Sequence, residues 1–316
     1  MKDIKERSVL INPSDIGTEW IDIFKSSGLE ILGIHPVAGR AAEGHLLRLL
    51  DMTGEKDLRD FVDEIYNSGG KVEYQIHAMS YLLPRSLFSS HPEYFRVDEN
   101  GKRTAEFNLC PSSGDALKIV EEKAYELASR LYRSSEKYYL WTDDVKDSFC
   151  HCEKCRDLSP SDQALMIYNA VLRGVRKYRS DAKVSYLAYQ EASPPPEKVK
   201  PEDGIFLEYA PIERDLSVPI TDEKNAPCRD VLAPLLDFFG RENSRVLEYW
   251  VDNSLFCGWH LPLKNLPFYP DVIKKDAEYY RLLGFEGLSS FACYLGPDYI
   301  KEFGTPPIKE FANLLK

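Results

Sequence analysis

The sequence predicts an α/β fold of the (β/α)₈ TIM-barrel class, with residues 1–316 forming a single domain. Eight short apolar runs alternate along the chain with segments of helical periodicity. The runs are apolar on both faces, as strands are in a parallel sheet that is covered by helices. Eight alternating β and α units over ~250 to 300 residues are typical of this barrel. A doubly wound sheet is the alternative, but no G-x-G-x-x-G phosphate loop follows the first run.

Four predicted strands lie in the first half of the chain, at residues 8–13, 29–37, 71–76 and 138–144. Helices are predicted at residues 15–27, 55–67 and 114–133, because apolar residues recur there three and four positions apart. Glycines follow the first two helices, as expected where a left-handed residue ends a helix. A long excursion after the third strand includes a brief extended piece at residues 107–111, which we treat as a loop segment.

The second half supplies the other four strands, at residues 184–190, 205–209, 246–250 and 288–294. The helix before them begins at Ser159 or Ser161, either of which is a suitable N-cap. Further helices are predicted at residues 229–239, 271–283 and 308–315. Helices therefore separate most of the strands, and a Pro-rich turn at residues 194–196 takes the place of a helix between the fifth and the sixth.

The composition excludes several classes of partner. A formal net charge of −11 argues against nucleic acid and against an anionic membrane surface. No apolar run approaches the ~20 residues that span a bilayer. The seven cysteines are odd in number and mostly scattered, which favours a reducing compartment over a disulfide framework. Because the first residues lack the apolar core of a signal peptide, we expect a cytoplasmic protein, or an exported one if a leader was removed.

The fourth predicted strand ends in two adjacent carboxylates, Asp143 and Asp144. Burying paired charges costs several kcal/mol unless they are partnered or one is protonated. Such a pair at the carboxyl end of a buried strand is therefore a candidate catalytic site. A solvated Asp-Asp turn is the alternative.

Other polar and aromatic residues come at the ends of the remaining strands, where barrel active sites lie. Carboxylates that bind hydroxyl groups and aromatic rings that stack on sugar faces are typical of a carbohydrate site. The candidate substrate-binding residues are His35, His77, Tyr81, Asn108, Trp141, Tyr189, Glu208, Tyr209, Trp250, Asp252 and Tyr294.

Four further motifs follow one another along the chain: residues 77–85 (HAMSYLLPR), residues 141–144 (WTDD) with the cysteines of residues 150–155, residues 161–163 (SDQ) and residues 206–211 (FLEYAP). In this order they resemble the motifs of the bacterial domain-of-unknown-function family 4838. The resemblance covers about residues 30–260. Part of that family is classified as glycoside hydrolase family 163, the endo-β-N-acetylglucosaminidases, so the resemblance implies a barrel that acts on glycans.

The Asp143-Asp144 pair also resembles the Asp-Asp pair of O-GlcNAcase-type hexosaminidases and the Asp-Glu pair of the family 20 hexosaminidases. In those families the acetamido oxygen of the substrate itself attacks the anomeric carbon. The resemblance implies that Asp143 orients the acetamide and that Asp144 is the general acid and base. Neighbouring strand residues point apart, so one pair can reach two parts of one sugar.

Two alternatives remain open. In the first, Asp144 is the acid and base of a retaining glycosidase and Glu248, at the end of the seventh strand, is the nucleophile. In the second, the barrel binds glycans without cleaving them, through Trp141, Tyr209, Trp250 and Trp259.

Three thiols lie close together in the motif Cys150-x-Cys152-x-x-Cys155, with His151 and Cys110 as possible fourth ligands. Structural zinc requires four sulfur or nitrogen ligands in a tetrahedron. The motif therefore has two interpretations, a structural zinc site or reduced cysteines that brace the loop after the fourth strand. No cofactor is expected to be required for catalysis.

Overall fold

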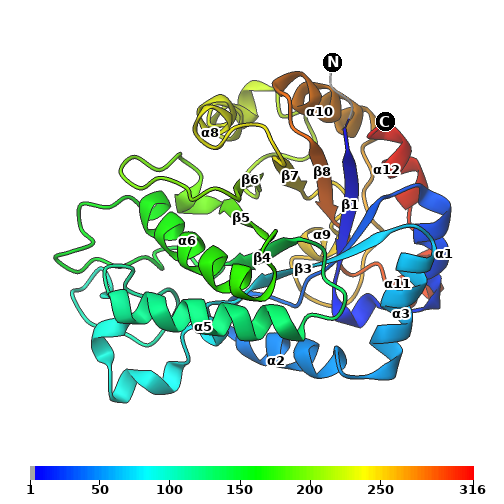
Figure 1. Ribbon diagram of the computed structural model, residues 1–316. Coiled ribbons are helices and arrows are strands. Elements are labelled where there is room, and N and C mark those ends of the chain that lie inside the picture. The colour runs from blue at the N-terminus through cyan, green and yellow to red at the C-terminus, as the bar shows by residue number, and fades with distance from the viewer. Residues whose placement is uncertain (1–3) are drawn as a thin grey trace. The chain divides into compact units, whose positions relative to one another are not determined.

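The computed structural model describes residues 4–316, and its eight parallel strands close into a barrel in the order of the sequence (Figure 1). The predicted fold class is thus confirmed. Pairing of the first strand with both the second and the last completes the ring. The strands are β1 (Glu6–Ile11), β2 (Ile31–Ile34), β3 (Lys71–His77), β4 (Lys137–Trp141), β5 (Lys183–Ala188), β6 (Ile205–Tyr209), β7 (Arg245–Glu248) and β8 (Gly287–Phe291).

Amphipathic helices follow most of the strands, and their apolar faces are buried. Ser159, rather than Ser161, caps the helix after β4, because its Oγ accepts a hydrogen bond from the amide of Asp162. The α-helices are α1 (Thr18–Ser27), α2 (Ala42–Met52), α3 (Lys56–Asn67), α4 (Met79–Leu82), α5 (Gly114–Arg130), α6 (Pro160–Tyr178), α7 (Ala226–Arg229), α8 (Leu232–Phe239), α9 (Asn253–Phe256), α10 (Pro270–Leu283), α11 (Pro297–Phe303) and α12 (Ile308–Leu314).

The chain divides into two compact units. One contains the chain up to His35, Gly54–Tyr74 and Leu207–Lys316, and it holds β1, β2, β7 and β8. In this unit the guanidinium of Arg245 is fully buried and forms ion pairs with Glu73 and Glu6. The expectation of a single domain stays a prediction.

The other unit contains Pro36–Thr53 and Gln75–Phe206, with β4, β5 and the helices α5 and α6. These two long helices lie side by side in Figure 1. Gly174 of α6 allows their close approach, because a Cβ there would lie 2.2 Å from the carbonyl oxygen of Glu121. This unit also holds the segments after β3 and β4 that carry the candidate site.

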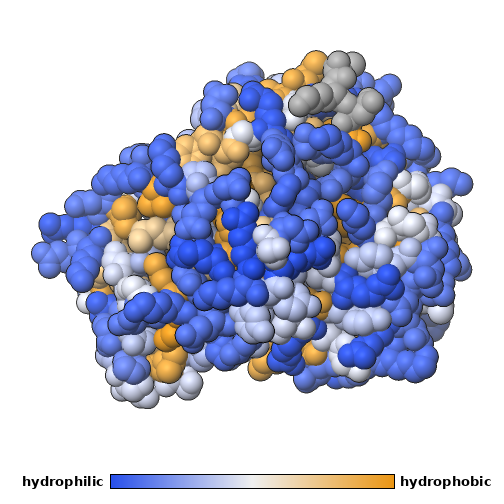
Figure 2. Space-filling view, in the orientation of Figure 1, coloured by the Kyte–Doolittle hydropathy of each residue, from blue (hydrophilic) through white to orange (hydrophobic). Residues whose placement is uncertain are grey.

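The molecular surface visible in Figure 2 is mostly hydrophilic, with apolar side chains in small areas. Within residues 4–316, no helix is both long and apolar enough to cross a membrane.

Candidate active site

Neighbouring elements of the same unit hold the side chains at the end of β4 and just beyond it. The indole N–H of Trp141 donates to Ser185 Oγ of β5 at 3.0 Å. Thr142 turns the other way, toward the hydroxyl of Tyr168 on α6 at 3.2 Å. Asp143 comes next, two residues beyond the end of β4.

Asp143 is held by groups from two other segments. Its Oδ2 lies 3.1 Å from Nη2 of Arg85, and its amide donates to Oδ1 of the buried Asn108 at 2.9 Å. Burial raises the pKa of Asp143, an effect that outweighs the lowering by Arg85 and His77 and adds to the repulsion from Asp144. The carboxyl of Asp143 therefore takes up a proton more readily than a solvated aspartate.

His77, at the end of β3, braces the backbone that precedes the pair. Its Nδ1 lies 2.5 Å from the carbonyl oxygen of Thr142, and its ring packs edge-on against Trp141 with centroids 5.1 Å apart. Because a carbonyl only accepts hydrogen bonds, Nδ1 carries the proton. His77 thus fixes the strand end from which Asp143 projects.

Asp144 has a different partner. The hydroxyl of Tyr189, just after β5, donates to Asp144 Oδ1 at 2.8 Å. The structure therefore gives the two carboxylates distinct surroundings, an ion pair for Asp143 and a phenol for Asp144. Distinct surroundings allow two neighbouring acids to take two chemical roles.

A cavity of about 270 Å³ lies beside Asp143. It is close to the lower end of small-molecule sites, about 300 Å³. Two buried polar atoms belong to residues that line it, Ser80 Oγ and Arg85 Nη1, and neither has a hydrogen-bond partner in the described part of the chain. Phe107 adds a partly buried aromatic ring to the wall. The cavity thus offers a ring, a hydroxyl and a guanidinium next to a carboxylate.

Ser80, Arg85 and Phe107 were not among the predicted substrate-binding residues. Phe107 has a positive φ of 64°, which is rare for a bulky residue and is concentrated at functional sites. Its ring also packs against the guanidinium of Arg40, 5.3 Å from the ring centroid. The motif at residues 77–85 contains Ser80 and Arg85, so their presence near the site had a signal in the sequence.

Of the other predicted residues in this unit, Asn108 accepts a hydrogen bond from the backbone amide of Asp143, and Tyr81 is partly buried in α4. Asn108 also donates through Nδ2 to Ser148 Oγ at 2.8 Å, so it links the excursion after β3 to the loop after β4. The structure therefore brings together Asp143, Asp144, His77, Asn108, Trp141 and Tyr189.

Glu248 lies in the other unit and does not open to solvent. Its side chain has 0% exposed surface, and its Oε1 lies 2.5 Å from both Arg214 Nη1 and the hydroxyl of Tyr280. Arg214 also pairs with the buried Asp276 at 2.8 Å. Glu248 therefore faces α10, where it forms part of a buried ionic network. A nucleophile must reach the substrate, so this burial does not favour that role for Glu248.

Neighbours of Glu248 are buried in the same way. The indole of Trp250 donates to Asp276 at 3.0 Å, and the hydroxyl of Tyr209 donates to the carbonyl of Cys228 at 2.6 Å. Glu208 is also fully buried. Trp259, by contrast, is 58% exposed.

A second group of acids, also in this unit, surrounds the ends of β1 and β8. Burial raises the pKa of Asp15 to about 7 and that of Asp252 to about 6. The amide of Tyr294 donates to Asp15 Oδ2 at 3.0 Å, and Asp252 caps α9. The ring of His35, just after β2, packs edge-on against the ring of Phe291 at the end of β8, with ring centroids 5.1 Å apart. Asp15 was not predicted, because at the start of a helical segment it looks like an ordinary capping residue.

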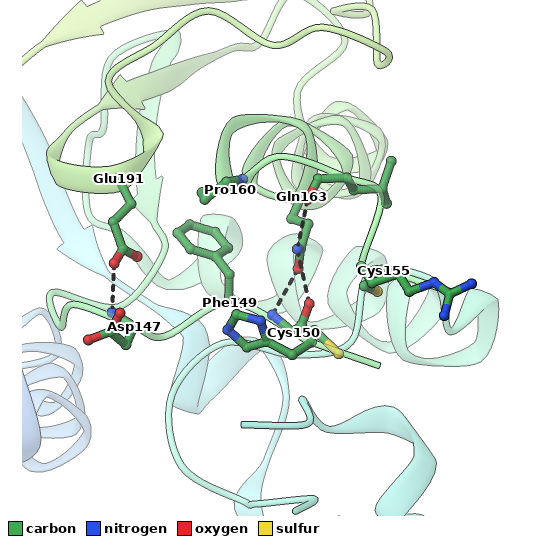
Figure 3. Close-up of a pocket in the computed structure, with 10 residues that line it drawn as sticks. Asp147, Phe149, Cys150, Cys155, Pro160, Gln163 and Glu191 are labelled. Carbon is green, nitrogen blue, oxygen red and sulfur yellow. Dashed lines mark hydrogen bonds between the residues drawn. The ribbon is translucent and has the colours of Figure 1, made fainter. Parts of the chain in front are cut away.

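The cysteine motif lies in the loop between β4 and α6, in the same unit as the acids. Gln163 of α6 holds the backbone of Cys150 from both sides, accepting from its amide at 2.9 Å and donating to its carbonyl at 3.1 Å (Figure 3). Cys150 and Cys155 line a cavity of about 170 Å³ with Phe149 and Pro160. None of the seven cysteines forms a disulfide.

The profile of the family described as Domain of unknown function (DUF4838) matches residues 52–237, more than half of the chain. The chain belongs to this family. The DUF4838 segment contains Asp143, Asp144, Tyr189 and the cysteine motif, whereas Glu248 lies beyond it. No curated protein matches this sequence.

The fold of this DUF4838 protein is similar to that of solved glycoside hydrolases. A β-galactosidase from the psychrophilic Marinomonas ef1 has a TM-score of 0.58 and 14% identity, covering 98% of this chain and 58% of its own. The PgaB (BpsB) glycoside hydrolase domain from Bordetella bronchiseptica has a TM-score of 0.56 and 14% identity, and the match covers 98% of this chain and 99% of that domain. Endo-glycoceramidase II from Rhodococcus sp. has a TM-score of 0.52 and 11% identity, and the match covers 98% of this chain and 78% of that enzyme. At these identities the likeness shows the fold, and this chain spans little more than half of the β-galactosidase.

Proposed function

We propose that the protein is a glycoside hydrolase that acts on glycans containing β-linked N-acetylhexosamine, with Asp143 and Asp144 as its catalytic pair. One observation carries the proposal. Asp143 and Asp144 follow a barrel strand and have different hydrogen-bond partners, and Asp143 borders a cavity whose residues present polar atoms without partners among the described residues. The barrels of solved glycoside hydrolases, which this fold resembles, support it.

In the proposed reaction, the acetamido oxygen of the substrate forms a bond to the anomeric carbon while the bond to the leaving oxygen breaks. Asp144 gives a proton to that leaving oxygen. Because Tyr189 binds Oδ1 of Asp144, Oδ2 is the oxygen that transfers the proton. Asp144 then takes a proton from the water that opens the cyclic intermediate, which restores the carboxylic acid.

Asp143 orients the acetamide in this scheme. Its carboxylate accepts the acetamide N–H and stabilises the positive charge that develops on the ring. Arg85 favours the ionised form that this role requires, whereas burial opposes it. Ser80 and Phe107 are placed to bind the sugar, the first by a hydrogen bond and the second by stacking. The reaction needs no cofactor.

The assignment is tested by Asp143→Asn and Asp144→Asn, with Asp147→Asn as the matched control. Asp147 is exposed on the same loop and has a left-handed backbone that asparagine tolerates. We expect Asp144→Asn to lower turnover on glycans about 10²- to 10⁴-fold, the usual contribution of acid–base catalysis. The loss should shrink on aryl glycosides with good leaving groups, which need no proton.

Asp143→Asn should lower turnover on both kinds of substrate, because the acetamide is involved whatever the leaving group. If the loss instead shrank on good leaving groups for Asp143→Asn and not for Asp144→Asn, Asp143 would be the general acid and Asp144 the residue that orients the acetamide. The raised pKa of Asp143 would agree with that exchange of roles. Equal losses for Asp144→Asn on every substrate would contradict the proposed acid. A thiazoline that mimics the cyclic intermediate should inhibit the wild type.

The retaining mechanism with Glu248 as nucleophile has weaker support, since Glu248 is inaccessible and bound by Arg214 and Tyr280. The two mechanisms predict different substrate ranges. A Glu248 nucleophile would accept sugars that lack the 2-acetamido group, and substrate assistance would not. A glycan-binding barrel without activity would bind N-acetylhexosaminides with no turnover, unchanged in Asp144→Asn.

A further inference from the structure

Four cysteine side chains converge at one point of the unit that carries the acids. Cys110 ends the excursion after β3, and the other three lie in the loop between β4 and α6. Their sulfur atoms all lie within 4.8 Å of one another. The Sγ of Cys110 is 3.6 Å from that of Cys152 and 3.8 Å from that of Cys155.

These separations are those of ligands on a tetrahedral metal. With a zinc–sulfur bond of about 2.3 Å, two sulfurs of a regular tetrahedron lie about 3.8 Å apart. A pair of thiols often comes this close in a core, but four from two distant segments rarely do so without a common ligand. Four cysteines also match the commonest all-sulfur structural site.

The surroundings of the sulfurs suit thiolates. The amide of Val97 donates to Cys150 Sγ at 3.3 Å, and the hydroxyl of Ser112 lies 3.1 Å from Cys155 Sγ. Hydrogen bonds of this kind orient and stabilise metal ligands from outside the coordination shell. Cys110, Cys150 and Cys155 are at most 3% exposed, so the site is closed to substrate.

We propose that Cys110, Cys150, Cys152 and Cys155 bind one structural zinc ion. His151 is not the fourth ligand, because it lies outside the group of converging ligand atoms and its side chain is exposed. The sequence left the choice between His151 and Cys110 open, and the sulfur positions decide it.

The zinc would hold the candidate catalytic residues in place. Asn108, two residues before Cys110, accepts from the amide of Asp143 and donates to Ser148, two residues before Cys150. A metal that ties Cys110 to Cys150 therefore closes a short ring of contacts through Asn108 and Ser148, and Asn108 in that ring binds the amide of Asp143. The ion would stabilise this arrangement without touching the substrate.

The first test is the metal content of the wild-type protein, expressed with added zinc and purified without chelators. Plasma mass spectrometry should find one zinc per chain. Cys110→Ser and Cys155→Ser should reduce zinc to well below half of that value, whereas Cys228→Ser should keep it. Cys228 is a matched control because it is a free, partly buried thiol outside the group.

The second test uses only the wild type, so it does not depend on how the variants fold. The four thiols should resist alkylation by N-ethylmaleimide in the native protein and become reactive when a chelator is added, as read by peptide mass spectrometry. Protein refolded with cobalt should show the visible bands of a tetrahedral thiolate site. A protein with no bound metal, with iron in place of zinc, or with a zinc content unaffected by Cys110→Ser would overturn the proposal.

Discussion

Glu248→Gln should lower the stability of the protein and leave its activity unchanged. Glu248 Oε1 is bound at 2.5 Å by both Arg214 and Tyr280, and the side chain has no exposed surface. Glutamine keeps the shape and one oxygen but loses the charge. Hydrogen bonds to charged groups contribute about 1.5–3 kcal/mol each, and we expect a loss of stability in this range.

The expected change in Tm follows from the length of the chain. At about 2.1 cal/mol/K per residue, the unfolding entropy is roughly 0.66 kcal/mol/K, so the loss corresponds to about 2–5 °C. Arg214→Met should cost more, because it leaves Glu248 and Asp276 buried without their cation. Breaking a buried pair in this way costs about 3–5 kcal/mol, or about 5–8 °C.

Calorimetry gives the Tm and steady-state kinetics gives the turnover number, both measured on the same samples. Glu310→Gln, an exposed position on α12, is the matched control and should move Tm by less than about 1 °C. If Glu248→Gln kept the wild-type Tm and lost more than about 10²-fold in turnover, Glu248 would be a catalytic group. The buried ionic network would then not be its main role.

Two further predictions concern Asp15 and Asn108. Burial raises the pKa of Asp15 to about 7, so the folded state binds this proton more tightly than the unfolded state. The free energy of unfolding should therefore fall as pH rises from about 4 to 7, by up to about 4 kcal/mol from this group. Asp15→Asn should therefore become more stable relative to the wild type across that window in urea titrations, and a constant difference would contradict this. Asn108→Ala leaves the amide of Asp143 and the hydroxyl of Ser148 without their partner. The substitution should lower the free energy of unfolding by about 2–4 kcal/mol and should lower kcat/KM at least about tenfold. Activity within twofold of the wild type would show that Asn108 does not position Asp143.

The sequence predicted the strands well because each is an apolar run that ends in polar residues. It placed most of their ends too far along the chain, as for β4, which stops at Trp141 rather than at Asp144, whereas the end of β6 was predicted correctly. A parallel strand ends where its neighbours stop pairing, and a single sequence does not show this. The helix α2 was not predicted, although Leu46, Leu49 and Leu50 recur at helical spacing.

The side on which a strand-end residue lies was harder to predict than its position. In a strand that is apolar on both faces, alternation does not tell the barrel interior from the side that faces the helices. Asp143 and Glu248 therefore looked alike in the sequence, yet Glu248 pairs with residues of α10 and with Arg214. Arg85 and Phe107 were missed because the excursion after β3 brings them to Asp143 only through folding over a long sequence distance.

The excursion after β3 supports the loop that carries Asp143 and Asp144. A carboxylate with raised pKa requires burial, yet the loop after β4 is polar and would be mobile if it were held only by its own residues. Arg85 and Asn108 of that excursion contact Asp143, and Gln163 of α6 accepts a hydrogen bond from the loop at the amide of Cys150. A site that must keep two adjacent acids in different environments needs such support from several segments. The groups around the Asp143-Asp144 pair, more than the pair itself, therefore define what this barrel can do.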